Sequence, residues 1–147
     1  MYSNVTKLPD IPSFIEEAVA VPYVPFGRDY SGWDCWGLIY VAYRDLLGIT
    51  LPSYVGRYSD PEARKEVAAL LQDGRDSLVW HEVEKPKLLD LVLLKISGDP
   101  WHVGLFVQQN WMLHSWKDGT HCIRLSSIVW NKRIAGFFRH HSRLEGR

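Results

Sequence analysis

The sequence has few cysteines, no excess charge of either sign and no long apolar run. Its two cysteines, Cys35 and Cys122, are too few for a disulfide framework and give no sign of an oxidising compartment. Seventeen Lys and Arg residues balance seventeen Asp and Glu residues, so no net field draws the chain to nucleic acid or to an anionic membrane. No apolar run approaches the roughly 18 residues that a membrane span needs. We therefore expect neither nucleic acid binding nor membrane insertion.

Metal-binding and targeting signals are also missing. The cysteines and histidines form no Cys-x-x-Cys or His-x-x-x-His pair, so we expect no metal and no cofactor. The N-terminal residues contain no apolar segment of the kind found in signal peptides, which predicts synthesis in the cytoplasm without a signal peptide. What the chain does have is 46% hydrophobic residues and seven Trp in 147 positions. This composition predicts one globular domain over residues 1–147, with a single core.

The first half of the chain predicts helices. Capping residues and periodicity place three of them from Ser13 to before Pro22, from Cys35 to Gly48, and from Asp60 to Gly74. The segment from Pro22 to Gly32 is expected to be an ordered loop. On the second helix an apolar stripe consists of Cys35, Leu38, Ile39, Ala42 and Leu46. A cysteine on this stripe would face the body of the domain, within reach of a base on another element.

The second half switches to short runs rich in β-branched and aromatic residues, typical of strands. The expected strands are Leu78–Val83, Leu91–Ile96, Val103–Val107, Trp111–Trp116, Cys122–Leu125 and Ile134–Arg139. The strand that begins at Leu91 is apolar on both faces and is expected to be central. Helices followed by an antiparallel meander predict an α+β fold, in which the helix of Cys35 packs on a central antiparallel sheet.

Cys35 is the candidate nucleophile. It begins a helix, where the positive end of the helix dipole favours thiolate over thiol, and an ion pair with a histidine would favour the thiolate further. His102 is the candidate base, and His114 would hold the second ring nitrogen of His102. Two registers are open: a turn centred on Gln108 makes the two histidines cross-strand neighbours, whereas a two-residue turn at Gln109 and Asn110 shifts the pairing by three.

Four segments together resemble the NlpC/P60 family of cell-wall peptidases. They are Pro22-Tyr23-x-x-x-Gly27-x-x-x-x-Gly32-x-Asp34-Cys35-x-Gly37-Leu38, Leu89-Asp90-Leu91-Val92-Leu93, Trp101-His102-Val103-Gly104-Leu105-Phe106-Val107 and Met112-Leu113-His114, within residues 20–139. The resemblance implies a papain-like α+β fold and a catalytic set of Cys35, His102 and His114. It also implies cleavage of a peptide bond in bacterial peptidoglycan stem peptides through a thioester, often between γ-D-glutamate and a diamino acid.

The resemblance assigns three further residues to the oxyanion or the substrate. Tyr23 matches a tyrosine whose hydroxyl lies over the active site, where it would help the backbone N–H of Cys35 to hold the oxyanion. Asp34 has two readings, as the N-cap of the helix or as a substrate ligand. Trp36 stands where many members have serine, and its indole is expected to line the substrate groove. Phe26 and Leu89 stand where the family has glycine.

A narrower resemblance concerns the NlpC/P60 proteins of tailed phages and gene-transfer particles. It rests on Asp34-Cys35-Trp36-Gly37-Leu38, on Leu51-Pro52-Ser53-Tyr54 and on the segment from Trp130 to Arg139. It implies a component of the virion tail tip, with other tail-tip proteins as partners and action in the host cell wall. Two alternatives stay open: an amidase or acyltransferase with the same Cys–His chemistry, and a structural tail-tip or hub protein with a vestigial site.

Overall fold

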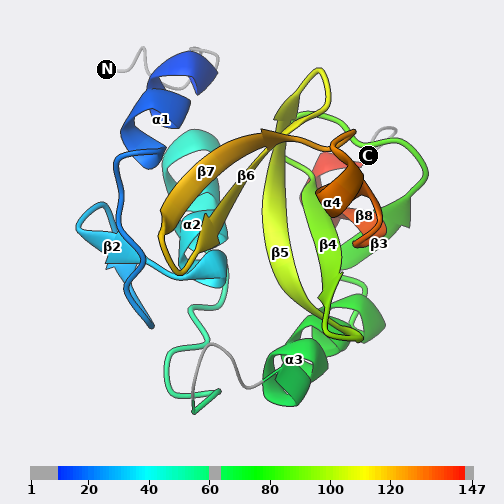
Figure 1. Cartoon of the computed structure of the whole chain (residues 1–147). Coiled ribbons are helices and arrows are strands. Elements are labelled where there is room, and N and C mark those ends of the chain that lie inside the picture. Colours follow the sequence, from blue (N-terminus) through cyan, green and yellow to red (C-terminus); the bar gives the residue numbers. More distant parts are fainter. Residues whose placement is uncertain (1–9, 60–63, 145–147) are drawn as a thin grey trace.

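The computed structural model describes residues 10–59 and 64–144 (Figure 1). Its helical elements are α1 (Ile11–Ala18), α2 (Cys35–Ala42), a π-helical turn (Tyr43–Leu47), α3 (Arg64–Asp76), α4 (Ile128–Asn131) and a 3₁₀ turn (His141–Arg143). Its strands are β1 (Arg28–Asp29), β2 (Gly32–Trp33), β3 (Trp80–Val83), β4 (Leu91–Ile96), β5 (Asp99–Gln108), β6 (Trp111–Trp116), β7 (Gly119–Arg124) and β8 (Ile134–His140). None of the described helices is long and apolar enough to cross a membrane.

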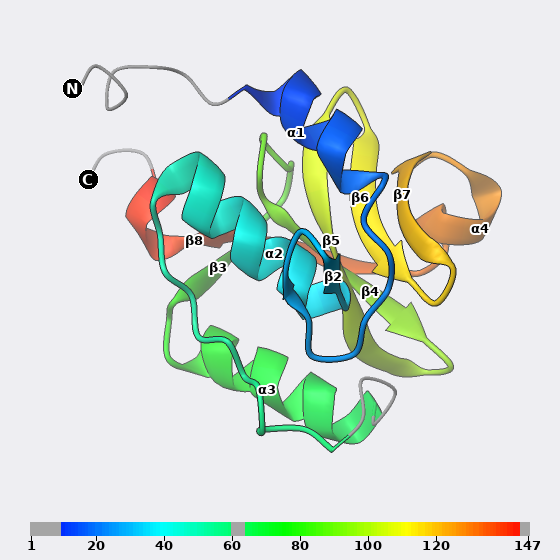
Figure 2. The same cartoon turned by 90° about the vertical axis from the view of Figure 1, so that its left-hand side faces the viewer.

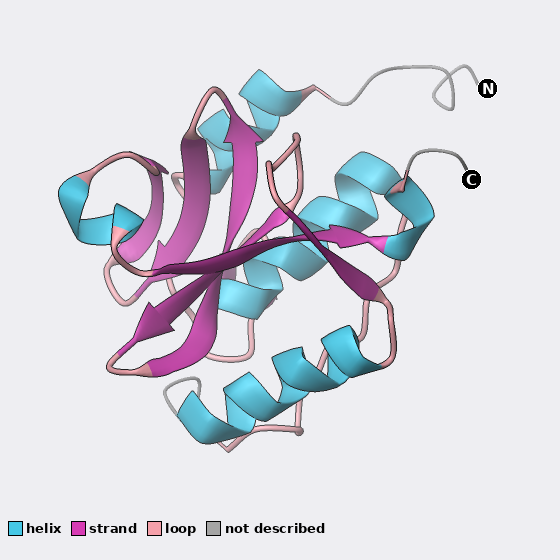
Figure 3. Cartoon of the chain, turned by 90° about the vertical axis from the view of Figure 1, so that its right-hand side faces the viewer, coloured by secondary structure: helices cyan, strands magenta, loops and turns pink. Residues whose placement is uncertain are grey.

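Six strands form one twisted antiparallel sheet in the order β3-β8-β4-β5-β6-β7 (Figure 3). The prediction that the strand beginning at Leu91 is central is confirmed, since β4 pairs with β5 on one side and β8 on the other. The prediction of a simple meander is wrong for β8, which returns across the sheet to lie between β3 and β4. The α+β class is confirmed.

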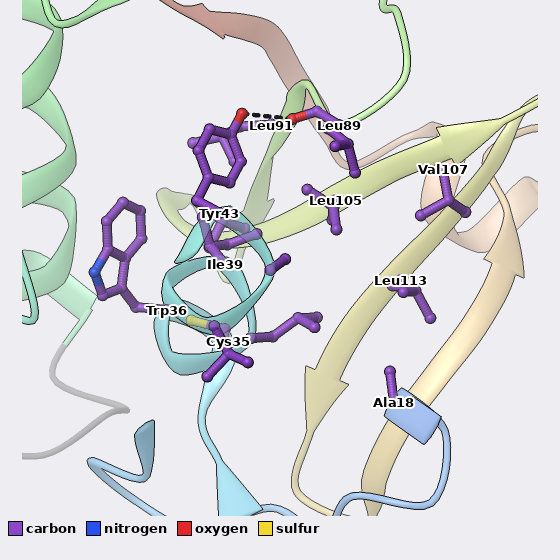
Figure 4. Close-up of a cluster of buried hydrophobic side chains, with 14 of the residues drawn as sticks. Ala18, Cys35, Trp36, Ile39, Tyr43, Leu89, Leu91, Leu105, Val107 and Leu113 are labelled. Carbon is purple, nitrogen blue, oxygen red and sulfur yellow. Dashed lines mark hydrogen bonds between the residues drawn. The ribbon is translucent and has the colours of Figure 1, made fainter. Parts of the chain in front are cut away.

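Helix α2 packs across one face of the sheet, between α1 and α3 (Figure 2). Every residue of α2 except Tyr40 is buried, so the expected apolar stripe is wider than one face. Figure 4 shows the resulting core, in which Ile39 and Tyr43 meet Leu105 and Leu113 of the sheet. The hydroxyl of Tyr43 donates to the carbonyl of Leu89 and ties the helical segment to the start of β4. Gly48 follows with φ +67°, the left-handed geometry expected of a helix C-terminus.

The opposite face of the sheet carries a smaller apolar cluster. Its buried members are Val92, Leu94, Phe106, Met112 and Leu125, and Trp130 of α4 packs against them. The two faces follow from strand alternation: odd positions of β5 such as Val103 and Leu105 face α2, whereas Phe106 faces the α4 side. His102 has the parity of Phe106, which places it on the α4 side as well.

Two helix boundaries differ from the predictions. The N-cap of α1 is Asp10, whose carboxylate accepts the N–H of Ser13, so Ser13 is inside the helix and not its cap. Helix α3 runs past Gly74 to Asp76. A side chain at Gly74 would crowd the indole of Trp80, so close packing explains this glycine better than a helix end. The predicted start at Asp60 lies outside the described residues.

Candidate active site

Asp34 is the N-cap of α2 and is only 1% exposed. Its Oδ1 accepts the N–H of Gly37 at 2.9 Å and the guanidinium of Arg28 at 2.8 Å. Its Oδ2 accepts the N–H of Phe26 at 3.0 Å and the hydroxyl of Tyr58 at 2.6 Å. Both oxygens are thus occupied by groups of the chain itself, which supports the N-cap reading and leaves no free lone pair directed to a substrate.

Close backbone packing holds the loop before Cys35 against the helix. A Cβ at Gly37 would collide with the carbonyl oxygen of Gly27, and a Cβ at Gly27 would collide with that of Gly32. These glycines are therefore needed for contact rather than for flexibility. Two positions where the family has glycine do carry left-handed backbone: φ is +64° at Phe26 and +72° at Leu89. The chain keeps a glycine-type conformation at both, although a side chain there costs about 1–2 kcal/mol.

Buried hydrogen bonds fasten the same loop to the sheet. The indole N–H of Trp33 donates to Oγ1 of Thr120 at 2.8 Å, and that hydroxyl donates to the carbonyl of Val21 at 3.0 Å. The hydroxyl of Ser115 donates to the carbonyl of Trp33 at 3.0 Å. Strands β6 and β7 thereby fix the residue two positions before Cys35, so that the start of α2 has a defined position relative to β5 and β6.

The register of β5 and β6 combines the two alternatives left open by the sequence. A two-residue turn at Gln109 and Asn110 pairs Gln108 with Trp111, but an irregularity after Phe106 moves the pairing by one, so that Phe106 faces Met112. The net shift is two residues, an even number, which leaves His102 and His114 on the same face. They are diagonal neighbours rather than direct partners.

The two imidazoles are buried and joined to each other. Nε2 of His102 lies 3.1 Å from Nδ1 of His114, and the side chains are 1% and 2% exposed. Trp130 lies over His114 with ring centroids 4.5 Å apart, and Trp116 lies 4.9 Å from His102 edge to face. This aromatic surround keeps water from the bond between the histidines.

A cavity of about 220 Å³ connects the nucleophile candidate to the base candidate. Its lining includes Cys35 from the start of α2, His102 from β5 and Tyr23 from the loop, so the structure brings these three predicted residues to one space. Nδ1 of His102 is buried and has no hydrogen-bond partner within residues 10–59 and 64–144. The imidazole therefore keeps one nitrogen free of protein partners while His114 holds the other. The remaining lining residues are Ile96, Ser97, Trp101, Ser115, Trp116 and Lys117.

The charge state of the candidate pair differs from the expectation of a thiolate and an imidazolium. Burial, followed by the carboxylate of Asp34, raises the pKa of the Cys35 thiol to about 12, although backbone N–H groups of Val103 and Trp36 act in the opposite direction. Burial, His114 and Arg133 hold the pKa of His102 well below its usual range. Both shifts favour a neutral thiol and a neutral imidazole in the resting site, because the cost of burying charge exceeds the effect of the helix terminus.

Trp36 is not part of the cavity that contains His102. Its indole is 4% exposed, donates to the carbonyl of Pro52 at 2.7 Å and packs on Tyr54 with centroids 5.1 Å apart. It lines a narrow apolar crevice of about 10 Å³ between α2 and α3, of which Cys35 forms another wall. Trp36 thus anchors the segment after α2, and its role in lining a substrate groove stays a prediction.

Two residues that hold the site together, Arg28 and Tyr58, were not predicted from the sequence. Arg28 bonds to Asp34 and also donates to the carbonyl of Ser53 at 2.7 Å and to the hydroxyl of Tyr58 at 2.8 Å. Such contacts join segments 25 to 30 residues apart and leave no local pattern in the sequence. Among the described residues, no group of three or more His, Cys, Asp or Glu side chains is placed to hold a metal ion.

Comparison with known proteins is consistent with this geometry. The model of the NlpC/P60 family matches residues 20–139. A comparison with curated protein sequences finds no match. Among solved structures, an NLP/P60-family protein described as similar to lipoprotein, from Staphylococcus aureus subsp. aureus Mu50, is 26% identical with a TM-score of 0.60. The match covers 95% of this chain and 45% of that one, so this chain spans less than half of the S. aureus protein.

Two further structures share the fold. The NlpC/p60 domain of the peptidoglycan hydrolase SagA is 18% identical with a TM-score of 0.57, over 88% of this chain and 98% of that domain. The peptidoglycan hydrolase RipB from Mycobacterium tuberculosis is 20% identical with a TM-score of 0.52, over 88% of this chain and 63% of that one. The family match covers all the residues that line the cavity and most of the sheet, and the chain is a member of the NlpC/P60 family.

Proposed function

We propose that the chain is a cysteine peptidase that hydrolyses peptide bonds in bacterial peptidoglycan stem peptides. The observation that supports it most is the cavity shared by Cys35 and His102, in which Nδ1 of His102 has no protein hydrogen bond while Nε2 is held by His114. A thiol beside an imidazole that a third residue orients is the arrangement required for nucleophilic acyl transfer. The peptidoglycan substrate is proposed from the family and from the hydrolases that share its fold.

The neutral resting state assigns His102 the role of general base. Nδ1 of His102 takes the proton of the Cys35 thiol as sulfur attacks the carbonyl carbon, and the resulting imidazolium then gives that proton to the leaving amine as the C–N bond breaks. Water, deprotonated by the same nitrogen, attacks the thioester carbonyl. The C–S bond then breaks, the carboxylic acid leaves, and His102 returns the proton to the sulfur of Cys35. No hydrogen bond between Cys35 and His102 is present in the free protein, and such bonds often tighten only when substrate binds.

The oxyanion would be held at the start of α2. The backbone N–H of Cys35 lies in the first helical turn, where N–H groups have no acceptor within the helix. Tyr23 lines the same cavity as Cys35, so its hydroxyl is the proposed second donor. Removing one oxyanion donor costs about 3–4 kcal/mol in transition-state stabilisation, so Tyr23→Phe should lower kcat by roughly a hundredfold or more.

Digestion of purified peptidoglycan and synthetic stem peptides, read by mass spectrometry, tests this proposal. Wild-type protein and a Cys122→Ser variant should release the same fragments, whereas Cys35→Ala and His102→Ala should release none. Fragments produced by cleavage of the bond between D-glutamate and the diamino acid would identify the protein as an endopeptidase. Fragments cut at the muramoyl amide would show an amidase instead of an endopeptidase. Acyl groups transferred to an added amine would show an acyltransferase. No product from folded wild type, or unchanged product from Cys35→Ala, would refute thiol catalysis.

We further propose that the protein acts as a tail-tip component of a phage-like particle, made in the cytoplasm and carried to the host wall. The support is the sequence resemblance around Asp34-Cys35-Trp36 and from Trp130 to Arg139. Particles assembled with Cys35→Ala should form normally but infect poorly through an intact wall. Normal infection by such particles would favour the structural hub, whereas absence of the chain from purified particles would remove the tail assignment altogether.

A further inference from the structure

A second polar pair lies just outside the buried histidines. His121 of β7 is the direct cross-strand partner of His114, with ring centroids 5.9 Å apart. Nε2 of His121 lies 2.7 Å from Oδ1 of Asp118, in the turn between β6 and β7. The side chains of this pair are 42% and 72% exposed, whereas His114 is 2% exposed. A row of four polar groups therefore leads from His102 in the cavity to solvent at the edge of the sheet.

The position of one proton on the buried pair decides whether His102 can act as a base. Nε2 of His102 and Nδ1 of His114 are 3.1 Å apart and share a single hydrogen bond. With His114 neutral and Nδ1 accepting, His102 carries its proton on Nε2 and has a free lone pair on Nδ1. If His114 gains a second proton, its Nδ1 becomes a donor, and the proton of neutral His102 must move to Nδ1. Nδ1 of His102 then carries the proton and offers no lone pair to act as a base.

The charged and titratable groups that face His114 come from four places. His102 approaches from β5, Arg133 from the turn before β8, and Asp118 and His121 from the β6–β7 side. Burial lowers the pKa of His114 to about 4, the charges of His121 and Arg133 act in the same direction, and the carboxylate of Asp118 opposes them. The hydrogen bond from His121 lowers the pKa of Asp118, which keeps the carboxylate charged into the acid range.

We propose that Asp118 and His121 are positioning residues whose opposed charges decide where the proton rests on the His114–His102 pair. They act through His114 and touch neither substrate nor thiol. Their effect is to set the acid limit of activity, the pH below which Nδ1 of His102 loses its lone pair. The consequence for catalysis rests on the proposed function, whereas the electrostatic coupling itself does not.

Removing the charge of Asp118 and removing that of His121 should shift the pH at which His114 titrates in opposite directions. Asp118→Asn removes the anion that favours protonation of His114, so His114 should titrate at lower pH. His121→Gln removes a group that, when protonated, opposes it, so His114 should titrate at higher pH. For a charge about 6 Å away, as His121 is from His114, each shift should lie between about half a pH unit with water-like screening and about two pH units with the weaker screening near a protein surface. His81→Gln is the matched control, because His81 lies on β3 at the far end of the sheet order.

The primary readout is the ring resonances of His114 followed by NMR from pH 7 to pH 3.5 in the full chain, with circular dichroism to confirm folding at each point. The acid limb of kcat/KM on stem peptide is the second readout and should move in the same directions. Asp118→Glu keeps the charge and should restore the wild-type midpoint. Shifts of the same sign in Asp118→Asn and His121→Gln, or none beyond the His81→Gln control, would overturn the proposal. If wild type cleaves no substrate, the proposed peptidase fails, but the NMR titration still decides the coupling.

Discussion

The protonation state of Cys35 gives the sharpest prediction, because the structure and the helix-dipole argument disagree on it. A pKa of about 12 in place of the usual 9.0 is a shift of three pH units. At neutral pH the thiolate fraction is then about a thousandfold smaller, equivalent to about 4 kcal/mol. A more basic thiolate is also more nucleophilic, and a Brønsted coefficient of about 0.4–0.5 returns roughly twentyfold. Ionisation alone should therefore make Cys35 about fiftyfold slower to alkylate when folded than when unfolded.

Iodoacetamide labelling of a Cys122→Ser variant isolates Cys35, and mass spectrometry gives its rate in buffer and in concentrated urea. The logarithm of the rate in the folded protein should rise with unit slope from pH 6 to pH 10 without a plateau. The exposed fraction of Cys35 is 7%, which slows the folded rate further. Rapid labelling that levels off at or below pH 7 would show a stable thiolate, and the neutral-pair mechanism would then be abandoned.

Three further outcomes follow from burial. Asp34→Ala should lower the free energy of unfolding by about 3–5 kcal/mol, because it leaves the Arg28 guanidinium buried without its carboxylate, whereas the exposed cap Asp10→Ala should cost only about 1 kcal/mol; urea unfolding compares them. Trp36→Ala should cost about 3–5 kcal/mol, while cleavage measured below its melting temperature should survive. His114 has a pKa of about 4 when folded and 6.5 in its ordinary state, so below pH 6.5 the unfolded chain binds a proton that the folded chain does not. The free energy of unfolding should fall by about 3 kcal/mol between pH 6.5 and pH 4. His114→Gln should remove this contribution to the pH dependence of stability.

The order of the elements was largely readable from the sequence. Apolar alternation and β-branched content are local, so the strands Leu91–Ile96 and Trp111–Trp116 were predicted with the bounds that they have. Placement in the sheet is not local. The insertion of β8 between β3 and β4 depends on pairing over more than forty residues, and no periodicity reports it. The irregularity after Phe106 likewise reflects strand twist and turn geometry rather than a residue pattern.

The candidate site was predictable in its members but not in its electrostatics. The positions of Cys35, His102 and His114 followed from family spacing, and the structure brings Cys35 and His102 to one cavity and joins His102 to His114. Their catalytic roles remain a proposal. The raised pKa of the thiol could not be predicted, because a helix terminus is visible in a sequence and burial beside a capping carboxylate is not. His121 could have been found, because a two-residue hairpin turn at Lys117 and Asp118 pairs position 121 with His114.

The position of β8 bears on how the protein matures. Strand β3 pairs only with β8 among the described strands, and one edge of β4 also depends on it. During translation β3 to β7 emerge before their missing neighbour, so an incomplete sheet with unpaired edges must wait for the last strand. The sheet on which α2 packs is therefore completed late. Packing of α2 on the complete sheet therefore follows synthesis of β8, the last of the six strands in chain order.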